Sequence, residues 1–350
     1  MESQLNKTAR AENSSMDDFV KDTSNACVVF AGAGTGKTTA IIRKLKYIVE
    51  NSIFSPERVV CLTFSREAAN NLLMRFRREV RSENEPIIKT FHSFSAQLLK
   101  NRSLSNSRNG GRNSELKIPR NFQILEPNES KVILHNYFRL PPQKAHEYVN
   151  AISKAKDLGI DLEKFEVALN KLSPLSIEQL EQRIESANLE KLLKKSPSSR
   201  SATSEKIPTR ILAQICEQKK FIQVWKRYEK LKARKTFLDY SDINLLALKL
   251  LREEPALASE FDYLIVDEFQ DTNKIQLELL FALAPHGRVA VVGDMNQSIY
   301  RFRGAYEKNV ESFISHFKVS EERIFKLNKS FRCPNTILRC ANRLAMRFSA

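Results

Sequence analysis

The residues with the clearest chemical potential lie in the segment Ala31 to Thr39, AGAGTGKTT, which follows the apolar run Val28-Val29-Phe30. Glycines in such a turn let backbone N–H groups approach phosphate oxygens, and a helix that begins near Lys37 adds the positive end of its dipole. Lys37 supplies a charge for the β- and γ-phosphates, and the Thr38 hydroxyl is placed to bind Mg²⁺. The segment therefore predicts a P-loop for a nucleoside triphosphate, with an ordinary glycine-rich turn as the weaker alternative.

Two adjacent acids follow a second apolar run. Residues Phe261 to Val266 predict a buried strand, and Asp267 and Glu268 come directly after it. In P-loop enzymes the first acid at this place holds Mg²⁺ and the second polarises the attacking water. An isolated pair of this kind could instead be a solvated acidic turn, but its occurrence together with a P-loop favours the nucleotide role.

A third apolar run, Val289 to Val292, leads into a segment that contains Gln297. Ligands of parallel α/β sheets bind at the carboxyl ends of the strands, so this segment is expected near the P-loop. We expect Gln297 to hydrogen-bond the γ-phosphate or the attacking water.

The elements that must position these residues form a parallel α/β sheet with a large insertion. Val59 to Phe64 predicts another strand, and apolar positions from Ala68 to Phe76 predict a helix after it. The P-loop and the acidic pair are too far apart for ordinary connections, so residues 101–235 are expected to form an inserted helical subdomain. Its helical patterns are Ser130 to Phe138, Leu162 to Leu172 and Ile211 to Leu231.

Two basic stretches within the insertion, residues 101–120 and 194–210, are rich in Ser, Asn, Arg and Lys. We expect them to be mobile loops, and both a solvated linker and contact with a phosphate backbone remain open. The whole chain has 57 basic and 41 acidic residues and a formal charge of +16, which suits a polyanionic partner. With no apolar run long enough for a membrane span and five scattered cysteines, we expect a cytoplasmic protein.

Six segments in order resemble the motifs of the UvrD/Rep-type superfamily 1 DNA helicases. The resemblance begins at the P-loop and ends near Leu344. The segments are AGAGTGKTT at 31–39, VVCLTFSREAANNL at 59–72, IIKTFHSFSAQLL at 87–99, YLIVDEFQDTNKIQ at 263–276, VAVVGDMNQSIYRFRGA at 289–305 and LNKSFRCPNTIL at 327–338.

This resemblance implies an ATP and Mg²⁺ site in a RecA-like motor domain. The implied catalytic residues are Lys37, Asp267, Glu268, Gln297 and Arg332, with Thr38 and Asp267 as metal ligands. Nucleotide contacts are implied for Ala31, Gly32, Ala33, Gly34, Thr35, Gly36, Lys37, Thr38, Thr39 and the stacking aromatic Phe331. Arg332 would stabilise charge on the transferred phosphoryl group when two motor lobes close.

The resemblance also implies a track for single-stranded DNA. Aromatic faces stack on any base while cations follow the backbone, and Phe302 lies between two arginines. The implied DNA contacts are Thr63, Phe64, Thr90, His92, Tyr300 and Phe302. For Phe64 and His92 alone, a packed core position is the simpler interpretation.

The implied domain plan assigns residues 1–100 and 236–319 to motor domain 1A, 101–235 to subdomain 1B and 320–350 to the start of domain 2A. Two features depart from the family pattern: no glutamine lies between Leu5 and Phe30 to contact adenine, and Thr39 replaces a frequent arginine. The later family motifs are absent, so we expect the N-terminal part of the motor.

The expected function is an ATP-dependent 3′-to-5′ DNA helicase that acts on single strands and strand junctions in repair or recombination. The alternatives are a RecB/AddA-like helicase-nuclease motor and a nucleotide-responsive DNA-binding module with little turnover. A DNA helicase of this kind is expected in the cytoplasm in association with the nucleoid. No membrane partner is expected, and protein partners remain open.

Overall fold

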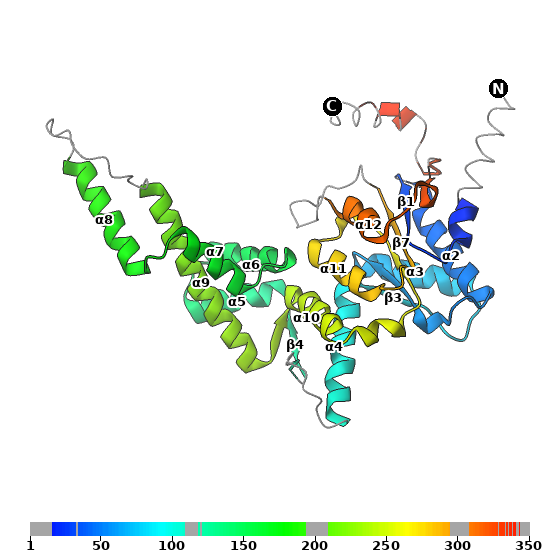
Figure 1. Ribbon diagram of the computed structural model, residues 1–350, viewed down its shortest axis with the longest axis horizontal. Coiled ribbons are helices and arrows are strands. Elements are labelled where there is room, and N and C mark those ends of the chain that lie inside the picture. The colour runs from blue at the N-terminus through cyan, green and yellow to red at the C-terminus, as the bar shows by residue number, and fades with distance from the viewer. Residues whose placement is uncertain are drawn as a thin grey trace. The chain divides into compact units, whose positions relative to one another are not determined.

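The structure of the chain is a computed structural model (Figure 1). It describes residues 16–32, 34–108, 118–119, 121–193, 209–294, 308–327, 329–332, 334, 336–337, 339–340 and 343. The described residues divide into two compact units, which we call the sheet unit (within 1–120 and 241–350) and the helical unit (121–240). Within the described ranges, no helix is both long and apolar enough to cross a membrane.

The sheet unit is built on six parallel strands in the order β3-β2-β6-β7-β1-β8. The strands are β1 (Cys27–Ala31), β2 (Val59–Thr63), β3 (Ile87–Thr90), β6 (Tyr263–Val266), β7 (Val289–Gly293) and β8 (Ile324–Leu327). β1, β2, β6 and β7 are buried at every position except Phe30, which is half-buried, as expected for parallel strands covered on both faces. The expected parallel α/β fold with a helical insertion is confirmed.

The helices of the sheet unit follow strands along the chain, as in other parallel α/β folds. They are α2 (Lys37–Glu50), α3 (Arg66–Glu79), α4 (Phe91–Arg108), α10 (Tyr240–Glu253), α11 (Lys274–Leu283) and α12 (Asn309–Phe317). Among the described residues, short 3₁₀ helices also lie at Pro56–Arg58, Pro255–Glu260, Phe269–Asp271 and Glu321–Arg323.

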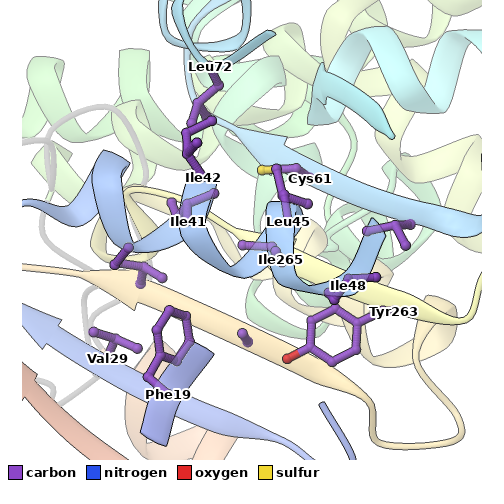
Figure 2. Close-up of a cluster of buried hydrophobic side chains, with 14 of the residues drawn as sticks. Phe19, Val29, Ile41, Ile42, Leu45, Ile48, Cys61, Leu72, Tyr263 and Ile265 are labelled. Atoms are coloured by element: carbon purple, nitrogen blue, oxygen red, sulfur yellow. The ribbon is translucent and has the colours of Figure 1, made fainter. Parts of the chain in front are cut away.

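The main core forms where α2 packs on the sheet (Figure 2). Ile41, Ile42, Leu45 and Ile48 recur at helical spacing on α2, and all four are fully buried. Their partners include Cys61 of β2 and Tyr263 and Ile265 of β6, together with Leu72 of α3. Burying each of these aliphatic side chains contributes about 1.5–3 kcal/mol, so this face fixes the helix that begins at the P-loop.

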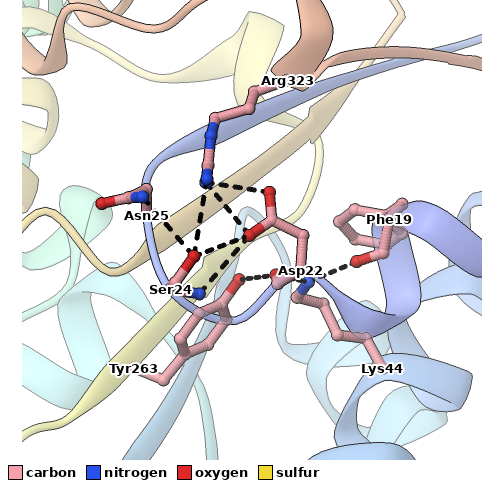
Figure 3. A network of polar contacts seen from close by, with 7 residues as sticks. All are labelled: Phe19, Asp22, Ser24, Asn25, Lys44, Tyr263 and Arg323. Atoms are coloured by element: carbon pink, nitrogen blue, oxygen red, sulfur yellow. Dashed lines mark hydrogen bonds and ion pairs between the residues drawn. The ribbon is translucent and has the colours of Figure 1, made fainter.

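A polar network also anchors α2 (Figure 3). Lys44 is fully buried, and its Nζ donates to the carbonyl oxygens of Phe19 and Asp22. Nζ also lies 4.3 Å from the centre of the Phe19 ring. The Asp22 carboxylate in turn accepts two hydrogen bonds of 3.0 Å from Arg323, just before β8. The network therefore joins α2, the segment before β1 and the start of β8.

The helical unit contains five helices and two short strands among its described residues. They are β4 (Gln123–Leu125), α5 (Pro127–Phe138), α6 (Pro142–Asp157), α7 (Leu162–Leu172), α8 (Ile177–Leu193), α9 (Thr209–Lys235) and β5 (Phe237–Asp239). Aromatic residues Tyr148, Phe221 and Trp225 form its core with ring centroids 4.9–5.7 Å apart. The three helices expected from the sequence are α5, α7 and α9, and α7 has the expected limits.

Two boundaries differ from the sequence analysis. Residues 101–108 belong to α4 rather than to a loop, because the buried first turns of this helix make its extension inexpensive. Strand β8 pairs in parallel with β1, with Val28 opposite Ile324, although residues 320–350 were assigned to a second motor domain. The sheet edge beside β1 gains its backbone hydrogen bonds from this pairing. Residues 109–117 and 194–208 lie outside the described residues.

Candidate nucleotide site

The P-loop lies between β1 and α2 and depends on left-handed glycines. Gly34 has φ +73° and Gly36 has φ +91°, values that side chains other than glycine rarely adopt. The Thr35 hydroxyl donates to the Gly32 carbonyl at 2.9 Å and closes the turn. No side chain caps the N-terminus of α2, which begins at Lys37. Its first N–H groups are therefore oriented to bind an anion.

The segment after β8 passes directly over this loop. The Phe331 N–H donates to the Gly34 carbonyl at 2.9 Å. A Cβ atom built on Gly34 would lie only 2.5 Å from the Cβ of Arg332. The expected residues Phe331 and Arg332 thus lie beside the phosphate loop, and Phe331 is 73% exposed. Glycine at position 34 is required both for its backbone angle and for this close approach.

The loop opens into a pocket of about 600 Å³ within the sheet unit. Four cationic side chains line it, namely Lys37, Arg43, Arg75 and Arg332, against one acid, Glu268. Arg75 also donates to the Thr39 hydroxyl at 3.3 Å. This excess of positive charge and the uncapped helix suit a triphosphate.

The acidic pair lies at the carboxyl end of β6, next to the loop. Lys37 Nζ and Glu268 Oε2 are 2.7 Å apart, although the residues are 231 positions apart in the chain. Glu268 has φ +50°, a left-handed conformation that is uncommon for a residue with a side chain. Lys37, the expected cation of the P-loop, therefore contacts Glu268, the expected base, directly.

Asp267 is the more buried acid, with 7% of its surface exposed. Burial, and then the neighbouring Glu268 charge, raises the pKa of Asp267 to about 6. A divalent cation would favour the ionised carboxylate, so the donor set of Asp267 and Thr38 fits the expected Mg²⁺. The Asp267 N–H donates to Leu62 of β2 at 2.8 Å, which fixes this residue at the sheet edge.

Gln270 is a further residue of the site, to which the sequence analysis gave no role. Its Nε2 donates to Glu268 Oε2 at 2.8 Å, and its Oε1 accepts from the Asp294 N–H at 3.0 Å. Gln270 lies within the DEFQ segment, but its partner after β7 could not be found from local spacing. Of the other predicted nucleotide residues, Ala33 and Gln297 lie outside the described residues.

The predicted DNA residues that the structure describes lie at the ends of two neighbouring strands. Thr63 ends β2 and Thr90 ends β3, and the two residues are paired in the register. Thr63 is fully buried, whereas Phe64 is 39% exposed. The Thr90 hydroxyl accepts from the Ser93 N–H at 3.2 Å and caps α4. Phe64 therefore offers surface for a base, while the two threonine side chains are buried.

His92 follows at the start of α4. Burial, and then the charge of Arg66, lowers the pKa of His92 to about 4. The imidazole is neutral at pH 7, so it can accept or donate a hydrogen bond but adds no charge to the surface. Tyr300 and Phe302, the other predicted DNA contacts, lie outside the described residues.

The combination of P-loop, acidic pair and parallel sheet defines a P-loop nucleotide-binding domain. Residues 12–318 match the model of the UvrD/REP helicase N-terminal domain. The chain therefore belongs to this family, which confirms the resemblance seen in its motifs.

Curated relatives include the ATP-dependent DNA helicase PcrA of Staphylococcus aureus, 28% identical over 97% of this chain and 40% of that protein. A probable DNA helicase II homologue of Mycoplasma pneumoniae is 29% identical over 97% of this chain and 41% of its own length. The ATP-dependent DNA helicase Rep of Buchnera aphidicola is 26% identical, over 95% and 44%. The chain thus spans about two fifths of the length of these relatives.

Proposed function

We propose that this chain forms the first motor part of an ATP-dependent DNA helicase that translocates 3′ to 5′ on single-stranded DNA. The observation that carries the proposal is the direct contact between Lys37 of the P-loop and Glu268 of the acidic pair in a cationic pocket. The family match and the names of the relatives, all DNA helicases, support DNA as the second ligand.

Binding of the triphosphate gives Lys37 a new partner. Its ammonium leaves Glu268 for the β- and γ-phosphate oxygens, which carry more charge than a single carboxylate. Glu268 is then free to accept a proton from the attacking water. Mg²⁺, held by Thr38 and Asp267, would neutralise charge on the phosphate oxygens. Arg332, next to Gly34, is placed to stabilise charge that develops on the transferred group.

Single-stranded DNA would bind along the ends of β2 and β3. Phe64 supplies the exposed aromatic face, and His92 supplies a neutral polar group. The side chains of Thr63 and Thr90 are buried, so these residues would help to position Phe64 and His92 rather than contact a base themselves. We further propose contacts from Tyr300 and Phe302, a preference for strand junctions, a place near the nucleoid and a role in repair or recombination.

The test is ATP hydrolysis by this chain with and without single-stranded DNA, with Lys37→Ala as the negative control. DNA-stimulated turnover that disappears in Lys37→Ala is the expected result. Nucleotide and DNA binding without turnover would favour the binding-module alternative, and binding of neither ligand would overturn the proposal. Unwinding of duplexes with 3′ or 5′ tails by a longer protein that contains this chain then tests the polarity.

A further inference from the structure

We propose that the nucleotide pocket binds purines with a 6-oxo group, guanine and hypoxanthine, at least as tightly as adenine, and that Arg43 determines this preference. The inference rests on the proposed function, because it concerns which nucleotide the same pocket takes. It is carried by the hydrogen-bond donors and acceptors that line the pocket beyond the phosphate loop.

The pocket extends along helix α2 away from the loop. Its phosphate end is the start of the helix at Lys37. Thr39 and Arg43 line the same pocket further along and share one face of the helix, because they are one turn apart. Arg43 lies about 9 Å from Lys37 along the helix axis. The base of a nucleotide whose phosphates bind at Lys37 therefore reaches toward Arg43.

Arg43 can turn its donors to a base without losing a strong bond. Its Nη1 lies 3.2 Å from the sulfur of Met16 and 3.6 Å from Asp17 Oδ1. A thioether is a weak acceptor. The side chains of Arg43 and Asp17 are 52% and 54% exposed, so water weakens their ion pair. The guanidinium has five N–H donors and no acceptor, so its preferred partner is an acceptor on the base.

Acceptors are scarce among the described residues that line the pocket. Three glycine carbonyls of the loop line it, and each already accepts a backbone hydrogen bond: Gly32, Gly34 and Gly36. The Thr39 hydroxyl accepts from Arg75, and the Glu268 carboxylate is bound to Lys37 at the phosphate end. The 6-amino group of adenine is a donor, so it is poorly matched to this lining.

The two kinds of purine differ in the edge that they present. Guanine and hypoxanthine offer two acceptors, O6 and N7, which an arginine contacts with two hydrogen bonds. Adenine offers the acceptor N7 and the 6-amino donor, which suit the amide of glutamine or asparagine. Among the described lining residues the pocket has Arg43 but no such amide. Phe331 can stack on either purine, so it does not discriminate between them.

Met16 is the place where one substitution should reverse the preference. Its sulfur contacts Arg43, and its Cε would lie 4.0 Å from a Cβ atom built on Gly36, so this side chain spans the pocket wall from Arg43 to the loop. Glutamine has nearly the same length as methionine. Met16→Gln therefore supplies an acceptor for the 6-amino group of adenine and a donor for its N7 without a larger side chain.

The experiment measures displacement of a ribose-labelled fluorescent ADP from the chain by ADP, GDP and IDP, which carry the three bases and are not hydrolysed. In the wild type, the dissociation constants of GDP and IDP should be no more than about twofold above that of ADP. In Arg43→Met and in Met16→Gln, the ratio of GDP to ADP dissociation constants should rise at least about fivefold.

Arg78→Met is the matched control for the loss of a positive charge. The Arg78 side chain is 75% exposed on α3 and is not among the residues that line the pocket. The ratio of GDP to ADP dissociation constants in this variant should equal that of the wild type. A rise like that of Arg43→Met would show that net charge, not contact with the base, sets the ratio, and would overturn the inference.

The remaining outcomes separate this inference from the proposed function. ADP that binds the wild type more than about twofold tighter than GDP, or a smaller rise than about fivefold in Arg43→Met, would overturn the inference and leave the proposed function in place. IDP binding more than about fivefold weaker than GDP would assign recognition to the 2-amino group and would also overturn it. Binding of none of the three nucleotides would overturn the proposed function. If Arg43→Met does not fold, the Met16→Gln ratio decides.

Discussion

Two of the three lysines of helix α2, Lys37 and Lys44, lie two turns apart in surroundings that differ in kind. Lys37 faces the pocket with a side chain that is 12% exposed, and its partner is the movable carboxylate of Glu268, which is 34% exposed. Lys44 is fully buried, and it donates to backbone carbonyls that cannot move independently of the chain. The comparison shows that one helix can hold an exchangeable charge at its start and a fixed one in its middle.

The largest expected effect is at the exchangeable lysine. Lys37→Ala should lower the rate of ATP hydrolysis at least about 100-fold, because a charged donor to the phosphates is lost. The midpoint of thermal unfolding should hardly change, since Lys37 contributes little to the core. A steady-state ATPase assay and a thermal melt measure both quantities. Turnover equal to that of the wild type would show that another residue, not Lys37, supplies the positive charge for the phosphates.

Replacement of Lys44, the fixed lysine, should lower stability and leave nucleotide binding intact. Lys44→Met should lower the free energy of unfolding by about 2 kcal/mol, because the carbonyl oxygens of Phe19 and Asp22 lose a charged donor. Urea denaturation measures this change, and the folded fraction should still bind nucleotide. Lys46→Met is the control, because the Lys46 side chain is 43% exposed and pairs with Glu50 of the same helix; its change should stay within about 0.5 kcal/mol. Equal losses in the two variants would contradict the distinction.

The ion pair between Asp22 and Arg323, in the same polar network, should contribute less to the free energy of unfolding than Lys44 does. Asp22→Asn removes the charge that pairs with Arg323 and should cost about 1 kcal/mol of unfolding free energy, because both side chains retain some exposure. Chemical denaturation measures the loss. The affinity for an ATP analogue should fall slightly if β8, which leads to Phe331, depends on this anchor. A variant as stable as the wild type would show that the pair is dispensable.

The smallest expected effect is a pH dependence. Burial lowers the pKa of Lys44 from 10.5 to about 8, so the unfolded chain binds more protons above pH 8 and stability rises with pH. Between pH 7.5 and 9 this group should add about 1 kcal/mol to the unfolding free energy. Burial also raises the pKa of Cys27 from 9.0 to about 11 and raises the pKa of Cys61, which lowers stability as the pH approaches and passes 9, so the effect of Lys44 is measured as the difference between the wild type and Lys44→Met. Lys44→Met should lack the rise.

The position of the P-loop beside the acidic pair at the sheet edge could be predicted because its signals are local, whereas the catalytic roles of these residues stay predictions. The P-loop spacing and the acids that follow a buried run are properties of single short segments, and the structure brings Lys37 and Glu268 together. The hydrogen bond of Gln270 to the Asp294 N–H and those of Lys44 to the Phe19 and Asp22 carbonyls were not predicted, because the partners lie in other segments of the chain. In the sequence of α2, Lys44 has the same appearance as the partly exposed Lys46, and only tertiary packing distinguishes the two.

Strand β8 was assigned to another domain for a related reason. With four residues, IFKL, β8 is too short for its sequence pattern to indicate which strand it pairs with. The long amphipathic helices of the helical unit were easier to predict, because their apolar spacing repeats over several turns.

The position of β1 in the sheet has a consequence for synthesis on the ribosome. Cys27 pairs with Ala290 on one side, and Val28 pairs with Ile324 on the other. Both neighbours of the P-loop strand therefore emerge roughly 260–300 residues after it, which corresponds to about 13–60 s at ordinary translation speeds. The helical unit is continuous in sequence and can fold during this interval. During this interval β1 is apolar and has no strand partner, so it is the segment of the nascent chain for which protection by a chaperone would matter most.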